Sequence, residues 1–364
     1  MSDPRPQDEV PALPTTTVTV IVPCFNEVDH IEACLRDLFE QDYPADLLDV
    51  VVADGMSTDG TRAVLAELAG RWPQRLRLID NPQRVQAAAL AAMVPLATGD
   101  VIVRADVHAR YAPDYVRQCV AVGAATGADN VGGAMRPLAG TRFQQALCRA
   151  LDSRLGVGNA GYRDAEREGW VDTVFLGAFR RDVFTRFGNF DPCATPNEDA
   201  ELNQRILQGG GRIYLSRAIV VHYVPRSSLR ALARQYFRYG KGRARTALKH
   251  RRLPTVRPLL PFGLVVGGAV LVATSRWQPF TRWVAAAYAT ACLAEAVRVS
   301  RQGPPAVPSS VPVIAAIFPV MHVCHGVGFA AGLVRYGLRP DWKRILRWCH
   351  SEPEVPVSIS EECS

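Results

Sequence analysis

Short apolar runs alternate with amphipathic segments along the first hundred residues of the chain. The runs are rich in Val and Ile, which is typical of buried β-strands, and they lie at 18–22, 49–53, 76–79 and 101–105. The segments between them have a helical repeat of apolar residues or are rich in alanine, and they lie at 31–39, 61–69 and 83–96. This alternation with short loops predicts an α/β fold on an open, mostly parallel sheet.

Polar side chains follow three of these strands. Glu27 comes shortly after the first strand, Asp54 ends the second, and Asp106 and His108 follow the fourth. Side chains two residues apart on a strand point to the same face, so Asp106 and His108 can converge on one ion. Carboxylate and imidazole suit Mn²⁺ or Mg²⁺, usually completed by substrate phosphates. That stretch alone is also compatible with a solvated strand end, but acids from several loops at one sheet edge favour a ligand site.

The middle of the chain has a less regular pattern. It predicts a strand at 171–175, short strands at 213–215 and 219–221, and a helix that begins at Asn197-Glu198-Asp199. Acids in the first turn of a helix are favoured by the helix dipole, which is the structural interpretation of Glu198 and Asp199. The functional interpretation is that they supply a general base.

The last third of the chain is basic and then strongly apolar. Residues 227–249 predict an amphipathic helix with arginines around its polar face, either a solvated surface helix or, because apolar runs follow, an interfacial one. Three apolar stretches follow, at 259–275, 283–297 and 311–334, and the third has the roughly 20 residues that a membrane span needs. Basic residues on both sides put both ends in the cytosol, which requires an even number of crossings and leaves one stretch re-entrant or interfacial.

Composition narrows the class of protein. The 364 residues are 48% hydrophobic and 21% charged, with a net charge of +7, which excludes a disordered chain. No nucleic-acid-binding motif accompanies the basic charge, and its position beside apolar segments favours a membrane surface. The nine cysteines form no C-x-x-C motif, so neither a disulfide framework nor a zinc site is expected. The resulting division is a disordered leader (1–16), a catalytic domain (17–226), an interfacial helix (227–252), a membrane region with two or three apolar segments (257–335) and a basic then acidic cytosolic tail (336–364).

Five motifs together resemble the family 2 glycosyltransferases, which have the GT-A type of Rossmann-like fold. They are VTVIVPCFNE, ADGMSTDGT, RADVH, GAFRRDVF followed by FGNFD, and NEDAELNQR, in the order and approximate spacing of that family. With QYFRYGKGR and the trailing apolar segments, the chain is most similar to the succinoglycan-biosynthesis group of bacterial exopolysaccharide enzymes. The resemblance covers residues 17–250 well and the membrane part loosely.

The resemblance implies a role for each matching residue. Asp199 would be the catalytic base and Asp106 would bind the metal on the donor diphosphate, with Glu198 and Gly177 on the acceptor side. The donor side would comprise Pro23, Glu27 and Asp54 around the nucleoside, and Gln235, Arg238 and Tyr239, which resemble the Q-x-x-R-W signature with Tyr in place of Trp.

One departure from the family pattern concerns the metal. Arg104 replaces the first Asp of the D-x-D motif, which removes a carboxylate and puts a cation beside the diphosphate. His108 would supply the missing ligand. The Asn and Gly that the family usually has around positions 84–90 are absent, and Arg84 and Gln86 stand nearby without a role that the sequence defines.

These features predict an inverting glycosyltransferase that uses Mn²⁺ or Mg²⁺. Its donor would be a nucleoside-diphosphate sugar, with a UDP-sugar expected, and its acceptor a polyprenyl-diphosphate-linked saccharide at the cytosolic face of the cell membrane. The product would enter exopolysaccharide or another cell-surface glycan, and no nucleic acid would bind. Two alternatives are a processive polysaccharide synthase and a non-catalytic membrane scaffold that binds nucleotide sugars.

Overall fold

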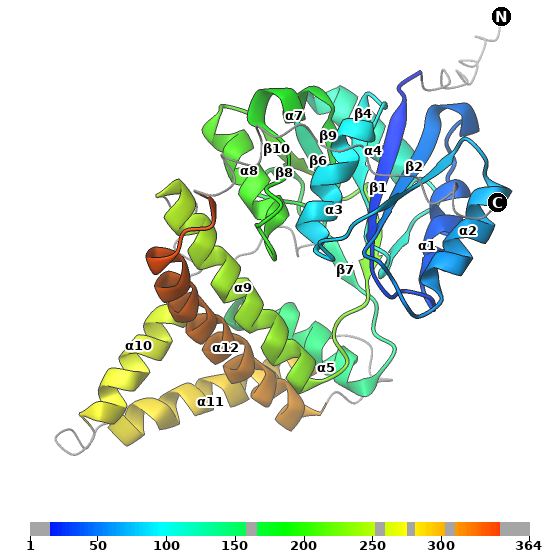
Figure 1. The fold of residues 1–364 in the computed structure, drawn as a ribbon. Helices are drawn as coiled ribbons and strands as arrows, with labels where there is room; N and C mark the ends of the chain where they lie inside the picture. The colour runs from blue at the N-terminus through cyan, green and yellow to red at the C-terminus, as the bar shows by residue number, and fades with distance from the viewer. Residues whose placement is uncertain (1–14, 158–165, 252–258, 275–280, 303–309, 343–364) are drawn as a thin grey trace, which may run out of the picture.

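A computed structural model describes residues 15–157, 166–251, 259–274, 281–302 and 310–342. Its main sheet has eight strands in the order β3-β2-β1-β4-β9-β6-β10-β8. The first half is parallel, as predicted, and consists of β1 (Val18–Cys24), β2 (Leu48–Asp54), β3 (Leu76–Asp80) and β4 (Val101–Arg104). The helices that connect these strands are α1 (Ile31–Phe39), α2 (Thr61–Arg71) and α3 (Gln86–Met93), with short 3₁₀ turns at Ala45–Leu47 and Val94–Leu96 (Figure 1).

The second half of the sheet is mixed. The central strand β9 runs antiparallel to both of its neighbours, β4 and β6. The strands of this second half are β6 (Asn130–Gly133), β8 (Gly169–Trp170), β9 (Phe175–Arg180) and β10 (Ile213–Leu215). The helices around this half of the sheet are α4 (Tyr115–Thr126), α7 (Asp182–Phe187) and α8 (Glu198–Gln208). A small second sheet contains β5 (Ala109–Tyr111), β7 (Met135–Pro137) and β11 (Val221–Tyr223).

Two predicted strands were misplaced. The strand expected at 171–175 begins only at Phe175, because Val174 instead packs over Gly132 and the Thr173 hydroxyl accepts a hydrogen bond from Asn203. The strand expected at 219–221 runs from Val221 to Tyr223, where it pairs with β5 and β7. In both cases partners distant in the sequence decide where pairing begins.

Alternation along the strands fills two cores. On β1, Val18, Val20 and Val22 pack into one hydrophobic cluster, whereas Ile21 packs into the cluster on the other face. Burial on both faces explains why these strands are continuously apolar rather than alternating. It also fixes the register, because a slip of one residue would exchange the two faces. The sheet therefore holds its carboxyl-terminal edge rigidly, and the loops that carry the functional side chains start there.

The C-terminal helices lie beside this domain. They are α9 (Leu229–His250), α10 (Leu259–Ala273), α11 (Thr281–Ser300) and α12 (Val311–Leu338). Two helices of the catalytic domain, α5 (Arg142–Leu151) and α6 (Arg154–Val157), pack against α12. Figure 1 shows α9 and α12 side by side, with α10 and α11 extending away from the catalytic domain. Among the described residues, α12 alone is long and apolar enough to cross a membrane. Nearly all of the expected leader lies outside the described residues. The part of the expected tail beyond residue 342 also lies outside them.

Candidate active site

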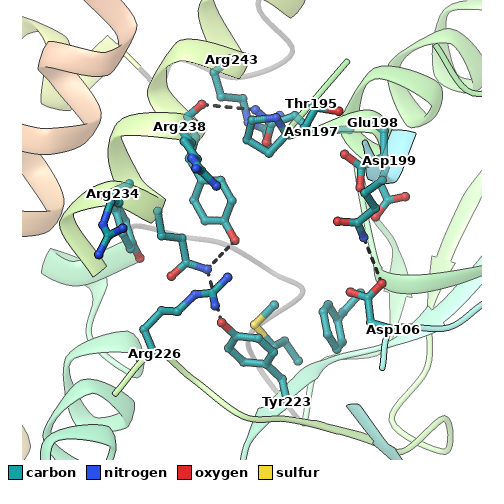
Figure 2. A pocket seen from close by; sticks show the side chains of 18 of the residues that line it. Asp106, Thr195, Asn197, Glu198, Asp199, Tyr223, Arg226, Arg234, Arg238 and Arg243 are labelled. Atoms are coloured by element: carbon teal, nitrogen blue, oxygen red, sulfur yellow. Dashed lines mark hydrogen bonds between the residues drawn. The ribbon is translucent and has the colours of Figure 1, made fainter. Parts of the chain in front are cut away.

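A cavity of about 1020 Å³ lies between the carboxyl-terminal edge of the sheet and the C-terminal helices. Its acidic wall carries Asp106, Glu198 and Asp199, and its basic wall carries Arg226, Arg234 and Arg238. Figure 2 shows these walls facing each other across the hollow. The acids come from the end of β4 and the first turn of α8, so two segments about ninety residues apart meet here.

Arg104 is the centre of the acidic wall. Its buried guanidinium contacts Asp106 Oδ1 at 3.1 Å and Glu198 Oε1 at 3.1 Å, and it forms a close ion pair with Asp199. One cation therefore serves three carboxylates. Asp199 Oδ1 is buried and has no hydrogen-bond partner among the described residues, so this oxygen can accept a proton.

Burial and neighbouring charges shift the pKa values of Glu198 and Asp199. Burial, reinforced by the neighbouring charge of Asp199 and opposed by Arg104, raises the pKa of Glu198 to about 7. Burial also raises the pKa of Asp199, although Arg104 opposes the shift. Carboxylates with raised pKa values in a cavity are characteristic of proton-transfer sites.

Asp106 is held by its surroundings in a defined position. The Tyr111 hydroxyl donates to the Asp106 carbonyl at 3.0 Å and accepts from its amide at 2.7 Å, while Gln86 Nε2 donates to Oδ1 at 3.1 Å. Gln86, whose role the sequence left open, thus orients the carboxylate that faces the cavity. Arg104 contacts the same oxygen, so the arginine that replaces the first acid of the motif is part of the site.

His108 lies with a different set of residues from the one expected. Its Nε2 is 2.9 Å from Glu27 Oε1, and its ring packs edge-on against His30 at 4.7 Å between centroids. The candidate ligand atoms of Glu27, His30 and His108 all lie within 4.8 Å of one another. Glu27 and His108 also line the cavity, as Asp106 does. Oxygen and imidazole donors at this edge fit a divalent ion. The nearest carboxylate to His108 among the described residues is that of Glu27, whereas the sequence analysis expected His108 to share an ion with Asp106.

The basic wall is organised by α9. Gln235 Nε2 donates to the hydroxyl of Tyr239 at 2.9 Å and to that of Tyr223 at 3.3 Å, which ties α9 to β11. Asn197, the N-cap residue of α8, donates to the Tyr239 carbonyl at 3.2 Å. The expected donor-side residues Gln235, Arg238 and Tyr239 therefore do line the cavity, together with Pro23 at the end of β1.

Two expected site residues do not line this cavity. Asp54 is fully buried, and its carboxylate accepts hydrogen bonds from the Ser57 hydroxyl at 2.5 Å and from Arg62 at 3.1 Å. Asp54 therefore stabilises the loop that follows β2. Gly177 lies inside β9, where an added Cβ would be 2.3 Å from Asn130 Oδ1. Close packing explains this glycine, and the prediction that it contacts the acceptor is corrected.

The sequence analysis missed several cavity residues. Tyr223 and Arg226 lie at the end of β11 and in the loop after it, where the local pattern gave no signal, because only the docking of α9 completes the cavity around them. His30 sits at the start of α1 and was overlooked, although its position three residues after Glu27 was a usable signal.

A second ionic cluster lies less than one helical turn further along α8. The buried Glu201 accepts from Arg205 at 2.7 Å and from Lys249 at 2.7 Å, and it lies 2.9 Å from His250. Burial by itself would raise the pKa of Glu201, but His250, Arg205 and Lys249 together hold that pKa far below its usual range. These contacts fasten α9 to the catalytic domain, so the end of the helix that was expected to be solvated or interfacial instead pairs with buried carboxylates.

Comparison with known proteins agrees with this geometry. The glycosyl transferase family 2 model matches residues 19–187. The succinoglycan biosynthesis protein ExoA of Rhizobium meliloti (strain 1021) is 35% identical over 335 residues, which cover 90% of this chain and 98% of that protein. The chain belongs to the family 2 glycosyltransferases. It is an enzyme with the GT-A fold, as the sequence motifs predicted.

Two further similarities concern this glycosyltransferase. A dolichyl N-acetyl-α-D-glucosaminyl phosphate 3-β-D-2,3-diacetamido-2,3-dideoxy-β-D-glucuronosyltransferase of Methanococcus voltae is 24% identical, over 68% of this chain and 78% of its own length. The solved structure of the mannosyltransferase PcManGT from Pyrobaculum calidifontis, in complex with GDP-Man and Mn²⁺, is 25% identical with a TM-score of 0.62 and covers 87% of both chains.

Proposed function

We propose that this glycosyltransferase moves one sugar, with inversion, from a nucleoside-diphosphate donor to a saccharide carried on a polyprenyl diphosphate. The donor is expected to be a UDP-sugar, and the reaction takes place at the cytosolic face of the cell membrane. One observation carries the proposal: a single cavity extends from the carboxylates at the sheet edge to an apolar wall made by Leu260, Leu264 and Met321. A water-soluble acceptor would not require that wall.

The names of the relatives support this choice of substrates. One relative is named for succinoglycan biosynthesis and another for transfer to a dolichyl-phosphate-linked sugar. The PcManGT structure contains a nucleoside-diphosphate sugar with Mn²⁺. Together these names favour a nucleotide-sugar donor, a lipid-borne acceptor and a divalent ion for this chain.

The residues of the acidic wall fit a single displacement. An acceptor hydroxyl loses its proton to Asp199 as its oxygen bonds to the anomeric carbon, and the bond from that carbon to the diphosphate breaks with its electron pair on the leaving group. Arg104 keeps Asp199 in position and stays charged beside the departing diphosphate. A divalent ion held by Asp106, with His108 and Glu27 nearby, would neutralise charge on that diphosphate.

The basic wall offers contacts for two diphosphates. Arg238, in the segment similar to the family signature, is assigned to the donor. Arg226 and Arg234 are exposed, line the cavity and remain available to the diphosphate of the lipid-linked acceptor.

The test is transfer of label into lipid. Liposomes that contain the full chain and polyprenyl-diphosphate-linked saccharides are incubated with a panel of labelled nucleotide sugars, and the lipid-soluble fraction is counted. Label from one donor is expected in that fraction, and Asp199→Asn is expected to remove it, whereas Asp182→Asn on the exposed surface of α7 is the matched control. Label that stays water-soluble throughout the panel would contradict a lipid-linked acceptor.

The closest alternative is a processive synthase, which the Gln235, Arg238 and Tyr239 set in the cavity wall favours. The length of the product distinguishes the two functions. A single added sugar supports the proposal, and a ladder of products from one acceptor supports the synthase.

A further inference from the structure

We infer that the helical hairpin formed by α10 and α11 is the part of this protein that enters the bilayer, whereas α12 stays outside the hydrocarbon core as a strut. The inference rests on the proposed function for the lipid-borne acceptor and adds how the enzyme reaches it. It reverses the simplest conclusion from hydropathy, by which α12 would be the span.

Both ends of α12 contact the same domain. Near its start, Ile314, Ile317 and Phe318 pack into one hydrophobic cluster with Ala146 and Leu147 of α5. A helix of 28 residues is about 42 Å long, so a span would place its two ends on opposite sides of a hydrocarbon core of roughly 30 Å.

At the other end, Asp341 lies three residues after the last residue of α12. Its Oδ1 accepts from Arg245 Nε of α9 at 2.8 Å, and Arg245 Nη2 contacts Asp191 of the catalytic domain at 3.0 Å. A helix held to one domain at both ends cannot also have those ends on opposite sides of a membrane.

The face of α12 toward α9 adds a second constraint. An added Cβ on Gly328 would lie 2.1 Å from the Phe237 carbonyl oxygen, and one on Gly240 would lie 2.0 Å from that of His325. The two backbones therefore touch along their length. Because α9 carries Arg234 and Arg238, a crossing by α12 would draw a basic helix into hydrocarbon, which is costly.

α10 has the opposite character. None of its residues is buried, and from Leu259 to Ala273 it has no charged or polar side chain. Val272 is 71% exposed and Val270 is 56% exposed. An exposed apolar surface of this extent, on a helix that packs mainly against α12 and points away from the domain, marks a site of contact with membrane.

α11 completes the hairpin, and its charged side chains, Arg282, Glu295 and Arg298, lie toward its two ends. Arg282 and the exposed Trp283 stand at its start, a pair typical of a membrane–water interface. Near its other end, Glu295 pairs with Arg298 at 2.6 Å and accepts from the Ser153 hydroxyl at 2.5 Å, which returns the chain to the catalytic domain. α10 has 15 residues and is therefore about 22 Å long, too short to cross a hydrocarbon core of roughly 30 Å. The hairpin therefore enters and leaves the bilayer on one side, and none of the described helices crosses, which also satisfies the even count.

The bilayer fits this surface better than a second copy of the chain, because α10 also lines the cavity. Leu260, Pro261 and Leu264 contribute to its wall, so the surface that meets lipid is continuous with the site where the proposed acceptor reacts. An acceptor whose lipid tail lies in the bilayer can then present its saccharide to the cavity without leaving the membrane.

The experiment measures flotation of the purified full chain with phosphatidylethanolamine–phosphatidylglycerol liposomes, without donor or acceptor. Val270→Glu and Val272→Glu on α10 are expected to lower the bound-to-free ratio about tenfold or more. Val334→Glu on α12, at a side chain 64% exposed, is the matched control and is expected to lower it less than about threefold. Thermal unfolding checks that each variant is folded.

Quenching by brominated lipids gives an independent measurement. Trp283→Phe is expected to lower the tryptophan quenching that the parent shows. Unchanged flotation of both α10 variants, an equal loss from Val334→Glu, or unchanged quenching in Trp283→Phe would overturn the inference, as would variants that change only the oligomeric state. None of these outcomes depends on sugar transfer, so the proposed function is tested separately.

Discussion

Helix α8 carries two buried carboxylate clusters that behave in opposite ways. In its first turn, Glu198 and Asp199 share one guanidinium, that of Arg104, and burial leaves their pKa values raised. Less than a turn later, Glu201 is surrounded by cationic partners from α8 and α9, and its pKa is lowered despite the same burial. Burial is common to both clusters, so the ratio of cations to carboxylates decides which one is reactive and which one only holds the structure together.

The largest effect is expected from breaking the second cluster. Glu201→Gln leaves Arg205 without a charged partner and Lys249 with Asp191 alone, so the free energy of unfolding should fall by about 3–5 kcal/mol. The stabilisation by Glu201 is present above the pKa of an ordinary glutamate, so chemical denaturation at pH 7 measures it in full. Glu67→Gln, at an exposed pair on α2, is the control and should change it by less than about 1 kcal/mol. Equal losses in the two variants would contradict the comparison.

In the first cluster, which contains Glu198 and Asp199, a substitution is expected to lower the rate of sugar transfer. Asp199→Asn keeps the shape of the side chain and removes its basicity, so turnover should fall about 10²-fold or more while donor affinity stays nearly unchanged. Steady-state transfer and calorimetric titration with the nucleotide sugar measure the two quantities. Turnover near that of the parent would remove Asp199 from the role of base.

Binding of the metal at the edge of the first cluster is expected to change by a smaller factor. Asp106→Asn should weaken Mn²⁺ binding in the presence of UDP by about tenfold or more, measured as free Mn²⁺ by electron paramagnetic resonance. His108→Ala should have a smaller effect in the same direction. Normal affinity in Asp106→Asn, with loss in His108→Ala, would place the ion with Glu27, His30 and His108 instead.

The smallest effect is a shift of the pH profile. Because the pKa of Glu198 is about 7 and that of Asp199 is raised, the pair gains a proton as the pH falls through neutrality. The kcat/KM for the acceptor should therefore fall about tenfold per pH unit below that pKa. Glu198→Gln removes a like charge, so the acid limb should move to lower pH. A limb near pH 4 in the parent would contradict the raised pKa.

Local patterns were sufficient for much of the fold. Val- and Ile-rich runs separated by amphipathic segments predicted β1 to β4 and α1 to α3, and acids at the start of α8 marked its first turn. These elements form where the chain buries its own periodic apolar faces, so a short window of sequence contains the information. The family motifs added Asp106, Glu198 and Asp199, which do meet in one cavity.

The remaining features depend on contacts between distant segments. Arg104 becomes the shared partner of three carboxylates only because α8 packs against the end of β4. Gly177 has the appearance of a binding residue in its motif, yet the side chain of Asn130 accounts for it. The longest apolar stretch of the sequence became a helix fastened to the catalytic domain at both ends, while the shorter α10 was left exposed. Hydropathy records which residues avoid water, but only tertiary packing decides whether protein or lipid covers them.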